Sequence, residues 1–481
     1  MPPGTEHTER IHASMKYQEQ LEAYIDGKER ELIAAVGRLV AVPSTKGAPE
    51  PGAPFGPGPR AALDEALKLA EEWGLTAASY DNYVGTIDLN EKETNLHILC
   101  HLDVVDPGTG WETNPYELTE RDGLIYGRGV DDDKGPAAIS LLAMRAVKDL
   151  GIPLKNNVRL ILGTDEESGS GDIEYYFARE PFAEYTFSPD AEFPVINLEK
   201  GGYHPLISRN WAPETALPRV TAIRGGIRIN VVSPEAGATV LGLTAAEVRP
   251  AAQSAEASTG TRIELADSAD GLHILVHGKN AHASTPDEGI NANTALLELL
   301  SALPLAKTDS TEAICALHAL FPHGDNRGTA LGIAMEDEIS HELTLTLSLL
   351  EMTETGIRAQ FDSRTPLCAS KENCIDICEA ACAAHGLQCA GDLRPVHYTP
   401  AETPFIQTLL QCYENYSGKK GCCVAIGGGT YVHDIPGGVA FGAGSFDFDS
   451  RLHAANERAR ISSMLMAAKI YAQSIVELCG A

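Results

Sequence analysis

Strand-like and helix-like segments alternate between residues 96 and 163 of this chain. Residues 96–101 (LHILCH) and 158–163 (VRLILG) are short apolar runs typical of buried strands, whereas residues 135–150 have the spacing of a helix. This alternation predicts an α/β fold in which helices cover both faces of a mixed, mainly parallel sheet. In such sheets, ligands bind outside the carboxyl ends of the strands, which directs attention to the residues that follow each strand.

The pattern changes near residue 201 and returns near residue 396. In between, GGIRINVVS, LHILVHG and ELTLTLSLLEM have the composition of longer strands, and NANTALLELLSAL and KENCIDICEAACAAHG have the spacing of two helices. A chain of 481 residues is also too long for one ordinary core. We therefore predict two domains: one formed by residues 1–200 and 396–481, and an inserted α+β domain at residues 201–395.

Helices are expected at both ends of the chain. Residues 19–40 (EQLEAYIDGKERELIAAVGRLV) have the pattern of one amphipathic helix, and residues 62–74 (ALDEALKLAEEWG) that of a second helix ended by Gly74. A Pro- and Gly-rich loop separates the two. The last helix is predicted from about residue 453 to residue 478.

The composition argues against nucleic acid and anionic membranes as partners. A net charge of −30 would repel their phosphate groups. No apolar run approaches the ~20 residues that a membrane-spanning helix needs. The polar N-terminus (MPPGTEHTER) lacks the apolar core of a secretory signal. We therefore expect a cytoplasmic protein.

The eleven cysteines are an odd count without the density of a disulfide scaffold, which favours reduced thiols. Cys374, Cys378 and Cys382 follow one another at i, i+4 and i+8 on a predicted helix. Three ligands that rise along one helix are too far apart to share an ion. We interpret these three as small buried residues.

Imidazoles and carboxylates stand at the predicted strand ends and turns. His101 ends its strand, and Asp132 follows a tight turn. Glu167 follows the strand at 158–162, Asp190 lies in the turn FSPDAEFPV, and His453 opens the last predicted helix. A two-metal site needs nitrogen and oxygen donors and one carboxylate that bridges both ions. These five residues are therefore the candidate metal ligands, although the run of acidic residues 131–133 leaves the bridging residue open.

Two further carboxylates complete the predicted site. A carboxylate outside the metal shell must take a proton from the attacking water and pass it to the leaving amine. Glu166 and Glu167 are adjacent, so Glu166 is expected to be this general base while Glu167 binds metal. Asp103, two residues after His101, is expected to support its imidazole. Each motif alone is usually a surface feature, and their order at successive strand ends is what indicates a metal-dependent hydrolase.

The sequence resembles the M20 family of metallopeptidases, most closely its long-chain bacterial dipeptidases of the PepV type, which act on Xaa-His dipeptides such as carnosine. The resemblance covers nearly the whole chain. Its motifs are HLDVV, YGRGVDDDKGP, GTDEESGS, FSPDAEFPV with EKGG, GKNAHASTPDEGINA, DSRTP, GGGTY and HAANE. One departure occurs after GGGTY: Val432, His433 and Asp434 stand where these dipeptidases usually have a small residue and a basic one.

The resemblance implies roles for the predicted metal ligands. His101 and Asp190 would bind one metal ion, and Glu167 and His453 the other. Asp132, selected by the D-x-K-G pattern, would bridge the two ions, with a cis peptide bond to Asp133. Glu166 would be the general base and Asp103 the residue that orients His101.

The resemblance also assigns the two domains, one as catalytic and the inserted one as a lid. His282 in the lid would stabilise the oxyanion. Arg364 would bind the substrate's terminal carboxylate, and Asn230 would make a further polar contact to the substrate. The lid is long, as in members whose own chain supplies the histidine, so a monomer would be catalytically competent.

The activity implied is hydrolysis of unblocked dipeptides by a water that bridges two zinc ions, with manganese or cobalt as alternatives. Another amidohydrolase of the same family, a deacylase of N-acylated amino acids or a carboxypeptidase, is one alternative. A non-catalytic metal-binding protein is the other, and the retention of Glu166 argues against it.

Overall fold

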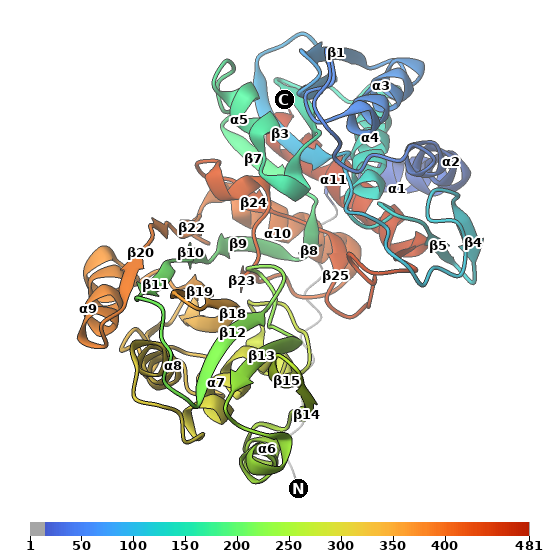
Figure 1. The fold of residues 1–481 in the computed structure, drawn as a ribbon. Helices are drawn as coiled ribbons and strands as arrows, with labels where there is room; N and C mark the ends of the chain where they lie inside the picture. Colours follow the sequence, from blue (N-terminus) through green and yellow to red (C-terminus); the bar gives the residue numbers. More distant parts are fainter. Residues whose placement is uncertain (1–14, 481) are drawn as a thin grey trace, which may run out of the picture. The chain divides into compact units, whose positions relative to one another are not determined.

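The computed structural model describes residues 15–480, and these residues form two compact units (Figure 1). Unit 1 comprises the described residues up to Leu198, then His397–Val424 and the residues from Gly429 onward. Unit 2 comprises Glu199–Val396 and the short piece Ala425–Gly428. The sequence indicates boundaries at 201 and 395, but it contains no signal for the short piece.

Unit 1 is built around a mixed sheet. Its strand order is β1-β2-β6-β3-β7-β24-β9-β22. The neighbours β6-β3, β3-β7 and β7-β24 are parallel, whereas β1-β2, β2-β6 and β24-β9 are antiparallel. The α/β class is therefore confirmed, with parallel strands in the middle of the sheet and antiparallel pairs towards its edges. The strands are β1 (Thr76–Tyr80), β2 (Val84–Asp88), β3 (Thr94–His101), β6 (Asn157–Gly163), β7 (Tyr185–Ser188), β9 (Val195–Glu199), β22 (His397–Tyr398), β23 (Cys423–Ile426) and β24 (Val439–Ala440).

Helices cover both faces of this sheet, as the side chains of β3 illustrate. Successive side chains of a strand point to opposite faces. Ile98 and Cys100 belong to the main apolar core with α4 and α11, which lie side by side (Figure 1). His97 lies on the other face, 5.9 Å from the ring of Phe177 in α5. The helices of unit 1 are α1 (Gln18–Asp26), α2 (Glu29–Val40), α3 (Pro57–Glu72), α4 (Lys134–Asp149), α5 (Gly171–Phe177), α10 (Pro404–Ser417) and α11 (Ile461–Cys479).

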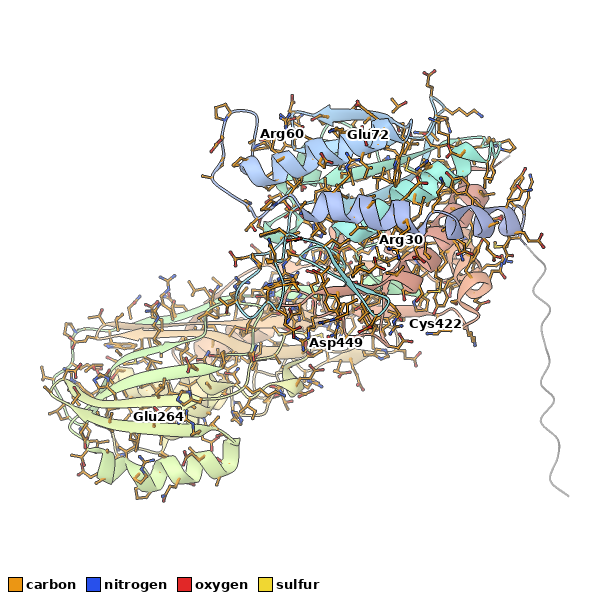
Figure 2. The ribbon with its side chains drawn as sticks, turned by 90° about the vertical axis from the view of Figure 1, so that its right-hand side faces the viewer. Arg30, Arg60, Glu72, Glu264, Cys422 and Asp449 are labelled. Carbon is orange, nitrogen blue, oxygen red and sulfur yellow. The ribbon has the colours of Figure 1, made fainter. Side chains whose placement is uncertain are left out.

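The helices α2 and α3 carry charged side chains, among them Arg30, Arg60 and Glu72 (Figure 2). Arg30 pairs with Glu120 at 2.7 Å, and Arg60 pairs with Asp64 at 2.9 Å. Exposed pairs of this kind contribute little to stability, so the helices are held mainly by their apolar faces. None of the described helices is long and apolar enough to cross a membrane.

The predicted bounds of two helices were wrong. Residues 19–40 form two helices, because a tight turn follows Asp26. In this turn the N–H of Lys28 donates a hydrogen bond to the Ile25 carbonyl oxygen at 2.9 Å. Apolar residues at helical spacing on both pieces made them look continuous. The last helix, α11, begins at Ile461 and not near 453. His453 lies in the preceding loop with a φ of 58°, which is incompatible with an α-helix.

Unit 2 has an antiparallel sheet of order β14-β15-β13-β12-β18-β19-β10-β21. Apolar side chains of its central strands pack with those of its helices into a second core. The strands are β10 (Gly201–Tyr203), β11 (Leu206–Asn210), β12 (Arg219–Gly225), β13 (Glu235–Leu241), β14 (Arg262–Ser268), β15 (Gly271–His277), β18 (Thr344–Thr353), β19 (Gly356–Thr365), β20 (Gln388–Ala390) and β21 (Leu393–Arg394). The helices are α6 (Ala245–Thr259), α7 (Ala292–Ser301), α8 (Asp309–Leu320) and α9 (Asp376–Ala384).

Two expectations for unit 2 were wrong. The sequence pattern indicated two helices, and it missed α6 and α8. It also placed a strand at GGIRINVVS, but β12 ends at Gly225 and the chain turns there. Gly226 has a φ of +80°, and a Cβ on it would lie 1.8 Å from the Ser348 carbonyl oxygen. Only glycine fits this turn, and the turn ends the strand.

Because His97 is buried, we expect the protein to lose stability in acid. Burial, together with the nearby Arg159, lowers the pKa of His97 to about 4. The unfolded chain takes up this proton near pH 6.5, so the stabilisation is complete above that pH and is lost as the pH falls towards 4. We expect His97 to account for about 2 kcal/mol of the stability lost between pH 7.5 and 5. Urea unfolding of the wild type and of His97→Gln at both pH values measures this contribution, and an equal loss in both proteins would contradict it.

Candidate metal centre

Five predicted ligands come together at one edge of the sheet in unit 1. His101 is the last residue of β3, and Glu167 lies in the 3₁₀ turn Glu166–Ser168 after β6. Asp190 follows β7, Asp132 precedes α4, and His453 lies in the loop before β26 (Arg458–Arg460). Because β3, β6 and β7 are parallel neighbours, the residues that follow them meet at the same edge.

The five side chains form two groups of three donors that share Asp132. One group is His101, Asp132 and Asp190, and the other is Asp132, Glu167 and His453. The donor atoms of each group lie within 4.8 Å of one another. The two oxygens of Asp132 face different imidazoles: Oδ1 is 2.8 Å from His101 Nε2, and Oδ2 is 2.8 Å from His453 Nε2. A carboxylate placed in this way can hold two cations at once.

Several buried atoms at the centre of the site lack a well-formed hydrogen bond among the described residues. They are Nε2 of His101 and Oδ1 of Asp132, which face each other at 2.8 Å, and Oε1 of Glu167, which lies 3.2 Å from His453 Nε2. Buried polar atoms without a well-formed hydrogen bond cost about 1–3 kcal/mol each. A metal ion held by these atoms would remove that cost, so the residues fit the metal ions that the sequence predicts.

The charges of the site also favour a bound cation. Burial and the Asp132 carboxylate raise the pKa of Asp190 to about 7. Burial opposes the charge on His453, but the carboxylates of Asp132 and Glu167 outweigh it and raise the pKa of the imidazole to about 10. Both shifts favour bound protons, which means that the clustered carboxylates attract positive charge. Divalent cations would replace those protons.

Asp103 supports the site differently from the expected way. His101 Nδ1 lies 3.0 Å from the main-chain oxygen of Asp103, whereas the carboxylate oxygen Oδ1 is 3.5 Å away. The carboxylate instead accepts hydrogen bonds from the main-chain N–H groups of Glu166 at 3.2 Å and Glu167 at 3.1 Å. Because a carbonyl oxygen only accepts, Nδ1 of His101 carries a proton, and Nε2 is the nitrogen that faces the carboxylates. The side chain fixes the turn that carries both glutamates.

Glu166 lies beside the donor groups but belongs to neither. Burial and the carboxylates of Asp190, Asp132 and Glu167 raise its pKa well above the usual range, while His101 acts in the opposite direction. A carboxylate with a raised pKa is a stronger base, and its protonated form is a competent acid near neutral pH. Position and environment therefore suit Glu166 for proton transfer.

Glu457 is a residue of this site to which sequence reasoning gave no role. It is fully buried and lies in the HAANE motif. Its carboxylate accepts a hydrogen bond from Arg128 Nη1 at 2.6 Å. It also accepts hydrogen bonds from the main-chain N–H groups of Gly129, Asp131 and Asp132 at 2.9–3.3 Å. Glu457 thus holds the loop that carries Asp132, whose peptide bond to Asp133 is cis. The only signal for this role was the presence of a glutamate four residues after His453.

Three predicted residues lie in unit 2. Asn230 and His282 are exposed and stand on two paired segments: Val231 bridges to His282, and Ala283 N–H bonds to the Asn230 carbonyl oxygen at 3.0 Å. His282 Nδ1 lies 2.6 Å from the Ser284 hydroxyl, which orients the ring. The pairing brings these two side chains onto neighbouring stretches although they are far apart in sequence.

Arg364 donates hydrogen bonds to three oxygen atoms of two residues. Its Nε and Nη2 donate to the two carboxylate oxygens of Asp362 at 2.7 and 2.8 Å, and Nη1 donates to the Gly427 carbonyl oxygen at 2.8 Å. Gly427 belongs to the short piece Ala425–Gly428 of unit 2, in the GGGTY motif. The guanidinium is therefore rigidly oriented. The departure at Val432–Asp434 lies in a 3₁₀ turn, Tyr431–Asp434, where His433 is buried.

An α/β sheet that gathers imidazoles and carboxylates at its carboxyl edge is the arrangement of a metal-dependent hydrolase. Comparison with known families matches residues 97–477 to peptidase family M20/M25/M40. The chain therefore belongs to this family of metal-dependent peptidases, which confirms the resemblance read from the sequence.

Individual relatives cover nearly the whole chain. It is 36% identical over 431 residues to "Putative dipeptidase YtjP" of Bacillus subtilis (strain 168), covering 89% of this chain and 92% of that protein. It is 32% identical over 432 residues to the Beta-Ala-Xaa dipeptidase of Lactobacillus delbrueckii subsp. lactis, with 88% and 90% covered. Among solved structures, aminoacylhistidine dipeptidase from Vibrio alginolyticus has the same fold, with a TM-score of 0.59, 13% identity, and 98% and 99% of the chains covered.

Proposed function

We propose that this protein is a dipeptidase that uses two divalent cations to hydrolyse unblocked dipeptides. The observation that carries the proposal is the pair of donor groups that share Asp132, with the uncoordinated Glu166 beside them. The names of the two relatives described above support a dipeptide as substrate. The imidazole and carboxylate donors suit zinc, which we propose as the metal, and also manganese or cobalt.

The metal ligands are assigned in two sets. His101 and Asp190 would hold one ion, Glu167 and His453 the other, and Asp132 both. When bound, the two cations would polarise the scissile carbonyl and acidify a water molecule. The main-chain oxygen of Asp103, 3.0 Å from Nδ1, would leave Nε2 of His101 free to bind the first ion.

Proton transfer is the task of Glu166. Its carboxylate takes a proton from the attacking water and, once the carbon–nitrogen bond breaks, gives that proton to the leaving amine. The raised pKa of Glu166 suits both halves of this transfer. Asp103 holds the main chain of Glu166 in place, because its carboxylate accepts a hydrogen bond from the Glu166 N–H at 3.2 Å.

The residues of unit 2 are assigned to the substrate. We propose that His282 stabilises the oxyanion and that Arg364 binds the terminal carboxylate of the dipeptide, with Asn230 as a further polar contact. We also propose that a single chain is catalytically competent. Eleven free cysteines suit a reducing compartment, so we propose the cytoplasm as its location.

A substrate panel tests the proposed activity. The purified protein is incubated with dipeptides, tripeptides, N-acylated amino acids and C-terminally amidated dipeptides, before and after a chelator removes bound metal. We expect rapid cleavage of free dipeptides, slow cleavage of their amidated forms and no cleavage of the other substrates, with loss of activity in the chelator and recovery on adding zinc, manganese or cobalt. Cleavage of acylated amino acids without dipeptides would identify a deacylase instead, and binding of metal without any turnover would identify a non-catalytic protein.

Arg364→Lys is expected to weaken recognition of the substrate's carboxylate. Lysine keeps the charge but cannot form the fork that pairs with Asp362 and a second carboxylate. Hydrogen bonds to a charged group contribute about 1.5–3 kcal/mol, so kcat/KM for a free dipeptide should fall by roughly 10- to 150-fold. The matched control is the amidated form of the same dipeptide, for which the wild type and the variant should differ little. An equal loss on both substrates would contradict the assignment.

A further inference from the structure

Unit 2 contains a cluster of three thiols that the proposed peptidase chemistry does not use. Cys378 and Cys382 occupy adjacent turns of α9, and Cys389 lies on β20. The three sulfur atoms lie within 4.8 Å of one another, and those of Cys378 and Cys389 are 3.7 Å apart. Cys378 and Cys382 are fully buried, while Cys389 is partly exposed.

The fold creates this cluster by reversing the chain after α9. Gly386, with a φ of +72°, makes the reversal possible, and Leu387 N–H returns to the Cys382 carbonyl oxygen at 2.9 Å. Strand β20 then pairs with β11, where Cys389 is opposite Ile207. The third thiol therefore comes from a strand and lies beside the inner face of the helix.

This arrangement changes the interpretation of the cysteines on the helix. Cys374, Cys378 and Cys382 are all buried, as expected, and Cys374 is outside the cluster because it lies one turn earlier. Three ligands along one helix are too far apart to share an ion. Cys389 supplies the missing donor from a different element.

The spacing of the sulfur atoms matches that of thiolates around one ion. A zinc–sulfur bond of about 2.3 Å in a tetrahedral site places sulfur atoms ~3.8 Å apart. The observed 3.7 Å separation and the 4.8 Å limit are close to this value, so only small side-chain rotations are needed. Thiolates also select soft ions such as Zn²⁺ and Cu⁺ over Mg²⁺ or Ca²⁺.

We propose that Cys378, Cys382 and Cys389 bind one thiophilic metal ion, with Zn²⁺ as the ion expected in the cell. On binding, the three thiols lose three protons, and the ion forms three metal–sulfur bonds. The bound ion would fasten α9 to β20 and so stabilise this end of unit 2. The site is distinct from the catalytic centre, which has only nitrogen and oxygen donors, and the proposal does not depend on peptidase activity.

Cadmium provides a direct probe because thiolate–cadmium bonds absorb in the ultraviolet and bonds to nitrogen or oxygen do not. The full-length protein is stripped of metal under reducing conditions and titrated with Cd²⁺. We expect the charge-transfer band to saturate at one thiolate-bound Cd²⁺ per chain and to decrease when Zn²⁺ is added. Cys389→Ser and Cys382→Ala should each remove most of the band.

Two exposed cysteines serve as controls. Cys315→Ser in unit 2 and Cys422→Ser in unit 1, whose position is visible in Figure 2, should leave the band unchanged. Circular dichroism and dipeptide hydrolysis verify that each variant is folded. The proposal is overturned if the wild type gives no band, or if Cys389→Ser keeps it. It is also overturned if the native protein, as isolated, has the mass of a disulfide between two of these cysteines.

Discussion

Glu166→Gln should reduce kcat by about 10²- to 10⁴-fold while the protein still binds its metal ions. The substitution keeps the size of the side chain but removes the carboxylate that accepts the proton. Glu166 belongs to neither donor group, so the ligands remain in place. The N–H of residue 166 would still bond to Asp103, because that bond involves only the main chain of residue 166. Steady-state kinetics and metal analysis of the same sample measure both effects.

The matched control for this variant is Glu167→Gln. Glu167 is adjacent and similarly placed, but it is assigned to the metal, so its substitution should lower metal content together with activity. If Glu166→Gln loses metal as Glu167→Gln does, Glu166 is a ligand and not the general base. If Glu166→Gln keeps full activity, the proposed proton transfer is wrong.

Glu457→Ala should destabilise unit 1 and impair metal binding together. The variant leaves Arg128, which is 1% exposed, without its charged partner. Removing one partner of a buried ion pair costs about 3–5 kcal/mol. The N–H groups of Gly129, Asp131 and Asp132 lose their acceptor as well. Urea unfolding measures the loss of stability, and titration with Zn²⁺ measures the loss of affinity.

Two controls separate the causes of this loss. Glu457→Gln keeps an oxygen acceptor for the loop but removes the charge, so it should fall between the wild type and Glu457→Ala in both measurements. Glu120→Ala removes the partner of exposed Arg30 and should change neither stability nor metal affinity. Normal zinc affinity in a destabilised Glu457→Ala would show that Glu457 stabilises the fold without positioning Asp132.

The strand-end residues could be anticipated because their position follows from topology. An apolar run such as 158–163 is recognisable in sequence, and parallel neighbours must present their carboxyl ends at the same edge. His101, Glu167 and Asp190 are therefore close together for a reason that needs no coordinates. The helix that follows Asp132 was equally recognisable from the spacing of its apolar residues, and the structure has it at Lys134–Asp149.

Features that depend on loop geometry could not be anticipated. His453 was placed at a helix start because loops carry no periodic pattern, and the structure puts it in a loop with positive φ. Whether His101 contacts the main-chain oxygen or the carboxylate of Asp103 depends on differences of a few tenths of an ångström. The approach of Cys389 to α9 required the register of β20 on β11, which sequence does not reveal.

The loop anchored by Glu457 has a consequence for how the enzyme is made. Arg128 and Glu457 are 329 positions apart, and the whole of Glu199–Val396 is synthesised between them. A chain still on the ribosome can fold unit 2 first, since that unit is nearly contiguous and has its own core. Asp132 gains its support from Glu457, and His453 joins it, only when residues 453–457 have emerged. We therefore expect nascent chains shorter than this to lack the metal centre that we propose.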